Sequence, residues 1–170
     1  ILFVAHEIKI GGATRSLLGV IAELLAKDYK VFVLVPRKKG ELIDELKTKD
    51  VTIIPCRYYS CIGKPSRTFK VKQFIKNILN YLFIVNVAKK IKLYNIDVIH
   101  TNSLVTNIGG YLKKKINVPH VWHIREFGKE DHGFIYSMSE KKTVKFIDEN
   151  SDKIIVISKA LLKKYQHFIS

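Results

Sequence analysis

The sequence has no long apolar run and no recognisable leader. Its richest apolar stretch, residues 78–91, is interrupted by Asn, Tyr and Lys. It therefore falls well short of the roughly 18 uninterrupted apolar residues that a membrane span requires. The first residues run directly into charged and Gly-rich sequence, unlike the basic, apolar and small-residue segments of a signal peptide. We expect a protein that neither spans a membrane nor is secreted.

Cysteine is scarce, with only Cys56 and Cys61 in one loop. A lone Cys-x4-Cys without a second pair or a nearby His is weak evidence for either zinc or a disulfide. We therefore predict two reduced thiols that are incidental to function.

Acidic residues are few, at 15 against 30 Lys and Arg, which gives a net charge of +15. Such an excess favours anionic partners, namely phospholipid headgroups, nucleic acid or phosphorylated substrates. The net charge alone does not distinguish between these partners, and some of the lysines must simply solvate helix faces. No helix-turn-helix, RNP-type or zinc pattern is visible, so a nucleic-acid-binding module is a weak alternative and we expect no nucleic-acid partner.

The length and the 47% hydrophobic composition fit one domain over residues 1–170. Short β-branched runs alternate with segments of helical spacing, which predicts β-α-β units and a mainly parallel sheet. Because these runs are continuously apolar, helices should cover both faces of the sheet. The fold class is therefore α/β, a Rossmann-like three-layer domain. The predicted strands are residues 1–5, 30–35, 51–54, 98–100, 120–122 and 153–157.

Helical spacing predicts a helix after the first strand and others over residues 41–48, 67–93 and 104–115. The Ser137-Met-Ser-Glu140 segment has the spacing of a capping box, which predicts a helix to about Asn150. The helix over 67–93 should bury one apolar stripe: Val71, Phe74, Ile75, Ile78, Leu82 and Val85. Its lysines and aromatic residues suit an anionic membrane surface or an ordinary solvated face, and aromatics on the exposed side would favour the membrane.

Ligands of an open parallel sheet bind beyond the carboxyl ends of its strands. The loop after the first strand contains Gly11-Gly12, where an anion could meet the amides of a helix start, although the pair could equally serve a tight turn. It matches neither a P-loop nor the full dinucleotide fingerprint. Arg37 and Lys38 after the second strand leave an NADP-dependent reductase as a weak alternative.

Polar residues also follow two later strands. His100, Asn102 and Ser103 come after one, and Asn102 or Ser103 could cap the next helix. His123, Arg125 and Glu126 follow the next, at a density that a plain connection does not need and a polyhydroxylated ligand would use. The alternative is a surface pair of Arg125 and Glu126 above a packed His123.

Four segments in this order resemble the amino-terminal domain of family 4 (group 1) retaining GT-B glycosyltransferases, and they cover nearly the whole chain. They are Gly11-Gly-Ala-Thr-Arg-Ser-Leu-Leu18, Asp97-Val-Ile-His-Thr-Asn102, Val121-Trp-His-Ile-Arg-Glu-Phe127 and Ser151-Asp-Lys-Ile-Ile-Val-Ile-Ser158. The resemblance implies transfer from a nucleotide-sugar, such as a UDP- or GDP-sugar, to a polysaccharide, lipid-linked or cell-surface glycan in a bacterium. The partners it implies are that donor, the acceptor and, for the basic charge, an anionic membrane surface.

The resemblance also assigns residues. It implies that Gly11, Gly12 and Ala13 face the donor diphosphate and that His123, the catalytic candidate, lies beside the transferred sugar. For the acceptor it suggests Thr14, Arg15, His100, Asn102, Arg125 and Glu126.

The chain begins without Met, and the family's second, donor-binding domain with its Glu-x7-Glu element is not in the sequence. We therefore expect a longer intact protein and an inactive isolated domain, or a non-catalytic sugar- or nucleotide-binding relic. The resemblance implies no metal and no cofactor, consistent with the lack of an Asp-x-Asp pair. The expected location is the cytoplasm, peripherally on the inner face of the cytoplasmic membrane.

Overall fold

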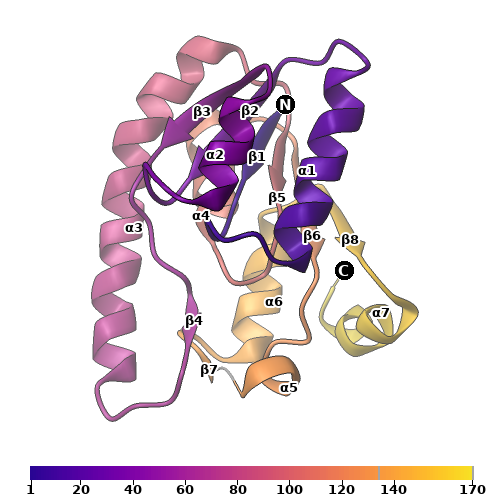
Figure 1. The fold of residues 1–170 in the computed structure, drawn as a ribbon. Coiled ribbons are helices and arrows are strands. Elements are labelled where there is room, and N and C mark those ends of the chain that lie inside the picture. The colour runs from indigo at the N-terminus through magenta and orange to yellow at the C-terminus, as the bar shows by residue number, and fades with distance from the viewer. Residues whose placement is uncertain (134, 170) are drawn as a thin grey trace.

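The computed structural model describes residues 1–133 and 135–169, which form a six-stranded parallel sheet in the order β3-β2-β1-β5-β6-β8 (Figure 1). All six predicted strands are present, with small shifts at their ends. Their bounds are β1 (Leu2–Val4), β2 (Val31–Val35), β3 (Val51–Pro55), β5 (Ile99–Thr101), β6 (His120–Ile124) and β8 (Lys153–Val156).

Helices cover both faces of the sheet, which confirms the three-layer α/β prediction. On one face, α1 (Gly12–Leu25) and α2 (Glu41–Lys47) pack on β1 and β2. On the other, α3 (Phe69–Ile91) and α4 (Ile108–Ile116) bury the opposite side chains of the same strands. A third cluster surrounds the buried Trp122 of β6 and includes residues of α6 (Glu140–Glu149) and α7 (Lys159–Tyr165).

Short elements occupy the two longer loops, at residues 56–68 and 125–139. The first contains β4 (Ile62–Gly63), which pairs antiparallel with β7 (Ile135–Tyr136), and the second contains α5 (Lys129–His132). The remaining elements are the 3-10 turns η1 (Lys92–Tyr94) and η2 (Gln166–Phe168).

Gly109 permits α4 to approach the sheet closely, and Gly110 permits it to approach α6. A Cβ on Gly109 would overlap the Thr101 hydroxyl and the His120 ring, and one on Gly110 would lie 2.8 Å from the Phe146 ring. A side chain at Gly109 would push α4 away from β5 and β6, and one at Gly110 would push it away from α6.

Two helix starts differ from their predictions. The capping-box prediction was wrong, because α6 begins at Glu140 and its cap is Ser139, whose hydroxyl accepts from the Lys142 amide at 3.3 Å. The helix predicted from residue 104 begins at Ile108 after Asn107, so neither Asn102 nor Ser103 caps it. Their side chains bond instead to other loops, as described below.

The predicted buried stripe of α3 was also wrong. Phe74 is 67% exposed and Val71 is 64% exposed, whereas the opposite side of the helix packs on the sheet. The reason is that the packed side is mixed in character, with Ile84, Ala88 and Ile91 joined by the polar Gln73 and Asn80. Asn80 bonds both the amide and the carbonyl of Tyr59, at 2.7 and 2.9 Å, so its burial is compensated.

Both cysteines are free thiols, as predicted. Burial raises the pKa of Cys56 to about 11 and that of Cys61 to about 12, so both stay protonated near neutral pH. Among residues 1–133 and 135–169, no helix combines the length and hydrophobicity needed to cross a bilayer.

Candidate functional site

The polar residues converge where the strand order reverses, between β1 and β5. Connections from these strands leave in opposite directions along the sheet, which opens a crevice beyond their carboxyl ends. Three loops border it: residues 6–11 after β1, 102–107 after β5 and 125–128 after β6. The site residues predicted from sequence lie on these loops, on the strand ends before them and on the first turn of α1.

The glycine pair opens the amino end of α1. Gly11 is the N-cap with a φ of −109°, and no side chain caps the helix. A Cβ on Gly12 would meet no atom within 4 Å. Because neither a positive φ nor a close neighbour demands glycine here, the tight-turn explanation gains no support. The pair leaves the first turn accessible, where free amides and the helix dipole favour an anion.

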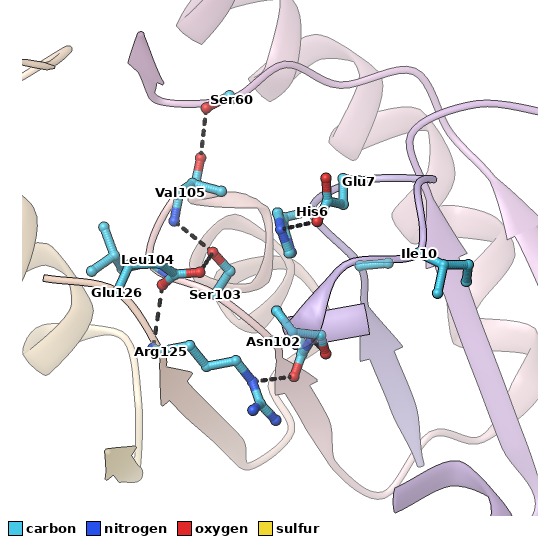
Figure 2. Close-up of polar contacts among 12 residues, drawn as sticks. His6, Glu7, Ile10, Ser60, Asn102, Ser103, Leu104, Val105, Arg125 and Glu126 are labelled. Carbon is cyan, nitrogen blue, oxygen red and sulfur yellow. Dashed lines mark hydrogen bonds and ion pairs between the residues drawn. The ribbon is translucent and has the colours of Figure 1, made fainter. Parts of the chain in front are cut away.

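Asn102 connects the loop after β5 with the first turn of α1 and with the loop after β6. Its side chain is buried, its Nδ2 donates to the Ala13 carbonyl at 3.0 Å, and its Oδ1 accepts from Arg125 Nε at 2.9 Å (Figure 2). The amide therefore holds the first turn of α1 in a defined position relative to the end of β6.

Arg125 in turn orients His123. Its Nη2 lies 3.2 Å from His123 Nδ1, and because a guanidinium only donates, Nδ1 is the acceptor and Nε2 carries the proton. Desolvation by burial, followed by the Arg125 charge, lowers the pKa of His123 to about 4. Near neutral pH, His123 is thus an uncharged hydrogen-bond donor through Nε2.

His100 supports this arrangement from within the protein. Its ring lies between Phe3 and His123, with centroid distances of 5.0 and 5.6 Å and edge-to-face geometry. Burial, together with the charges of His123 and Arg125, lowers the pKa of His100 to about 3. Its buried Nδ1 has no hydrogen-bond partner within the described part of the chain. The ring therefore acts mainly as a packing surface behind His123.

The carboxylate of Glu126 is engaged by protein donors. Oε1 accepts from Ser103 Oγ at 2.6 Å, and Oε2 accepts from the Leu104 and Arg125 amides at 3.1 and 3.2 Å (Figure 2). Glu126 thus fixes the loop that follows β5, which explains why Ser103 caps no helix. It forms no surface pair with the Arg125 side chain, which is directed to Asn102 and His123.

The two predicted residues at the start of α1 differ in exposure. Thr14 is 2% exposed, which places its side chain in the interior beneath the loops. Arg15 is exposed on the helix. The network described above therefore includes the backbone of this first turn and neither of these two side chains.

Sequence reasoning missed His6 and Glu7, which follow β1 directly. His6 Nε2 lies 3.1 Å from Glu7 Oε1 (Figure 2), and this hydrogen bond is the main cause that lowers the pKa of Glu7. The signal was present, because both are polar residues at the end of a buried strand. They were passed over in favour of the glycines that follow.

A groove extends from this site across the carboxyl edge of the sheet. It consists of three adjoining hollows of about 460, 340 and 440 Å³. The first includes Ala13 and Glu126 in its lining and shares His6, Glu7 and Ser60 with the second. The second shares Arg37, Tyr58 and Tyr59, among others, with the third.

The far end of the groove is basic. Arg37, Lys38 and Arg57 line the third hollow, and no carboxylate is among its described lining residues. Arg57 also lies over the Tyr59 ring, 5.5 Å from its centroid. The groove therefore runs from polar uncharged and acidic groups beside α1 to a cationic end suited to an anion.

Within residues 1–133 and 135–169, no group of three or more His, Cys, Asp or Glu side chains is arranged to hold a metal ion.

Solved structures similar in fold to nearly the whole chain include a glycosyltransferase and two complexes of a plant protein. A glycosyltransferase from Rickettsia africae matches with a TM-score of 0.60 and 18% identity, over 99% of this chain and 40% of that protein. Arabidopsis thaliana UGT89C1 complexed with UDP matches at 0.55 and 13%, over 98% of this chain and 46% of that one. Its complex with UDP-L-rhamnose matches at 0.54 and 11%, over 99% and 50%.

The chain thus spans half or less of each of these proteins, and at such identities the likeness concerns the fold. No curated protein sequence matches. The model of glycosyltransferase family 4, however, matches residues 10–169, which includes every site residue predicted from sequence. The chain therefore belongs to glycosyltransferase family 4.

Proposed function

We propose that this chain is the acceptor-binding half of a retaining glycosyltransferase that uses a nucleotide-sugar donor. The observation that carries the proposal is the chain of hydrogen bonds from Ala13 through Asn102 and Arg125 to His123. These hydrogen bonds fix the position of the accessible first turn of α1 relative to His123, the neutral hydrogen-bond donor. Such preorganisation is what a site for a sugar diphosphate requires.

The amino end of α1 would take the donor diphosphate. The amides after Gly11 offer hydrogen bonds and the partial positive charge of a helix start, without any metal. Support comes from the neighbour of the same fold that was solved with UDP. We propose the same class of donor here, and a reaction that needs no metal ion.

His123 would contact the transferred sugar. Because its pKa is lowered to about 4, it is a poor general base near neutral pH, and it acts through Nε2 as a donor to a sugar hydroxyl. The Arg125 hydrogen bond keeps the ring in the tautomer that presents this proton. Asn102, His100 and Glu126 would position these two residues without touching the sugar.

The groove would bind the acceptor. Its polar part beside His6, Glu7 and Ser60 suits a glycan, and its basic end at Arg37 and Arg57 suits a phosphate, as in a lipid-linked acceptor. The exposed Arg15 could contact such an acceptor from α1, whereas the buried Thr14 would only shape the wall. We place the reaction at the inner face of the cytoplasmic membrane.

The remaining donor contacts would come from a second domain. The three solved structures named above are at least about twice as long as the part that this chain matches. We therefore propose that residues 1–170 alone bind ligands weakly and do not catalyse transfer.

The test uses the full-length product of the gene, screened for transfer or hydrolysis with a panel of UDP- and GDP-sugars. In that protein, His123→Ala should lower kcat/KM by about tenfold to a hundredfold, because one hydrogen bond to the transferred sugar is lost. His167→Ala is the matched control, since His167 is exposed on η2 and lines no part of the groove.

Full activity of His123→Ala would remove this residue from the site. Tight nucleotide-sugar binding without turnover would identify a non-catalytic binding domain. Absence of both binding and turnover with every donor would contradict the transferase proposal itself.

A further inference from the structure

Helix α3 carries an apolar face that the fold does not cover. Six large side chains on it are between 44% and 67% exposed. They recur every three or four residues over about three turns, so they form one stripe on the side turned away from the sheet. In Figure 1, α3 runs along the outside of the molecule and extends past the end of the sheet. We call this face the α3 stripe: Val71, Phe74, Ile75, Ile78, Tyr81 and Leu82.

The α3 stripe is larger than the scattered apolar residues of an ordinary surface. Exposed hydrophobic residues occur singly on most proteins, whereas a contiguous row of six marks a site of interaction. The aromatic side chains Phe74 and Tyr81 lie on this exposed side. That is the arrangement expected of a helix that lies in a membrane interface.

The surroundings of the stripe are strongly basic. Residues 51–96 contain nine Lys and Arg and no Asp or Glu. Lys70 and Lys72 are exposed on α3 itself. From α4, Lys115 reaches Tyr81, with its Nζ 2.9 Å from the hydroxyl and 4.9 Å from the ring centroid. Cations next to an apolar stripe complement anionic headgroups above acyl chains.

Charge also argues against a second copy as the partner. An isologous dimer through the α3 stripe would place two such basic regions side by side in a protein of net charge +15. Like charges at that distance oppose association, and within residues 51–96 no acidic side chain is present to compensate.

The inner side of α3 contacts a residue that lines the groove. Asn80 binds the Tyr59 backbone through both atoms of its amide, and Lys76 Nζ lies 5.8 Å from the centroid of the Tyr59 ring. Tyr59 lines the basic end of the groove. A bilayer against the outer side of α3 would therefore lie next to the end suited to an acceptor phosphate.

We propose that the α3 stripe docks the protein onto an anionic lipid bilayer. The apolar side chains enter the interface and the flanking lysines contact phospholipid headgroups. Only the idea that docking brings a lipid-linked acceptor to the groove rests on the proposed function; the docking itself does not.

The test is co-sedimentation of the protein with vesicles of phosphatidylglycerol and phosphatidylcholine, and with vesicles of phosphatidylcholine alone. We expect binding to the anionic vesicles, weakening as salt is raised. Phe74→Ser with Ile78→Ser should lower the partition coefficient about tenfold or more, because two anchoring side chains are removed. Lys70→Gln with Lys72→Gln should reduce the preference for anionic vesicles.

The matched control is Ile157→Ser with Leu162→Ser, which removes two side chains that are 54% and 47% exposed outside α3. This variant should bind vesicles like the unmodified protein. Since all four apolar positions are exposed, unchanged thermal unfolding should show that the variants fold.

Three results would overturn the proposal. One is absence of binding to anionic vesicles, and another is equal binding by the Phe74 and Ile78 variant. The third is a soluble dimer or a nucleic-acid complex that this variant abolishes. The vesicle assay contains no sugar donor, so the two proposals fail separately. If the protein transfers sugar but does not bind vesicles, docking is contradicted and the proposed function is not. If it binds vesicles but transfers no sugar, only the proposed function is contradicted.

Discussion

Strand β6 carries a histidine near each end, and the protein surrounds the two rings differently. His120 is buried at the amino end, where Nδ1 donates to the Asn150 carbonyl and Nε2 accepts from the Thr101 hydroxyl at 2.8 Å. His123, near the carboxyl end, uses Nδ1 to accept from Arg125 and is only half-buried. Both nitrogens of His120 thus bond to protein groups, whereas only Nδ1 of His123 has a hydrogen-bond partner among the described residues.

The glycines near the two ends of the sheet differ in the same way as the two histidines. Gly109 is required by packing, since a side chain there would overlap Thr101 and His120. Gly12 has open space where a side chain would be. The space around the amino end of β6 is therefore filled by side chains, whereas space remains at the carboxyl end of the sheet, next to Gly12. This difference separates residues kept for stability from residues available for binding.

Gly109→Ala should produce the largest effect on stability. The new methyl group has no space between α4 and β5, so α4 must shift, and we expect a loss of about 3 kcal/mol or more in the free energy of unfolding. Urea unfolding measures it. Gly19→Ala in α1 is the control, because a Cβ there meets no atom within 4 Å and alanine favours a helix by about 1 kcal/mol. Equal stability of the two variants would refute the packing assigned to Gly109.

Acidification should have an intermediate effect. The pKa values of His100, His120 and His123 are lowered from 6.5 to about 3, 4 and 4, mainly by burial. The unfolded chain therefore binds more protons below pH 6.5, so stability is retained above that pH and lost as it falls toward 4. Urea unfolding across this range measures the slope. His120→Gln and His123→Gln should flatten it by similar amounts, because both pKa values are lowered to about 4. An unchanged slope in either variant would contradict the shift assigned to that ring.

Gly12→Ala should have the smallest effect on stability. Without a clash, its free energy of unfolding should change by no more than about 1 kcal/mol. In the full-length protein, however, the methyl group would stand where we propose that the donor diphosphate binds, so nucleotide-sugar affinity should fall. Calorimetric titration against the unmodified protein checks this. Unchanged affinity would show that the helix start is no donor site.

The fold could largely be predicted from the sequence, because its signals are local. Continuously apolar runs such as residues 31–35 identify buried parallel strands. The loops of the candidate site could also be located, since the carboxyl ends of parallel strands gather at one edge.

Local sequence patterns gave wrong predictions where more than one residue or helix face fitted the same structural role. Ser137 and Ser139 both resemble helix caps, but the Ser137 amide bonds the Cys61 carbonyl next to the β4–β7 pair, and Ser139 caps α6. In α3, periodicity showed that Phe74 and Ile78 share a face but not which way that face points. The buried polar Asn80 on the other side was the contrary evidence, and its partner Tyr59 is 21 residues away.

By itself, the sequence determined the strands, most of the helices and the polar loops, because propensity and hydrophobic periodicity act between near neighbours. Only the tertiary structure decided how the site is connected. Asn102 meets Ala13 across 89 residues and Arg125 across 23, and Ser103 meets Glu126 across 23. These partners depend on strand order, which joins β1, β5 and β6 in space, and no short segment of the chain contains that order.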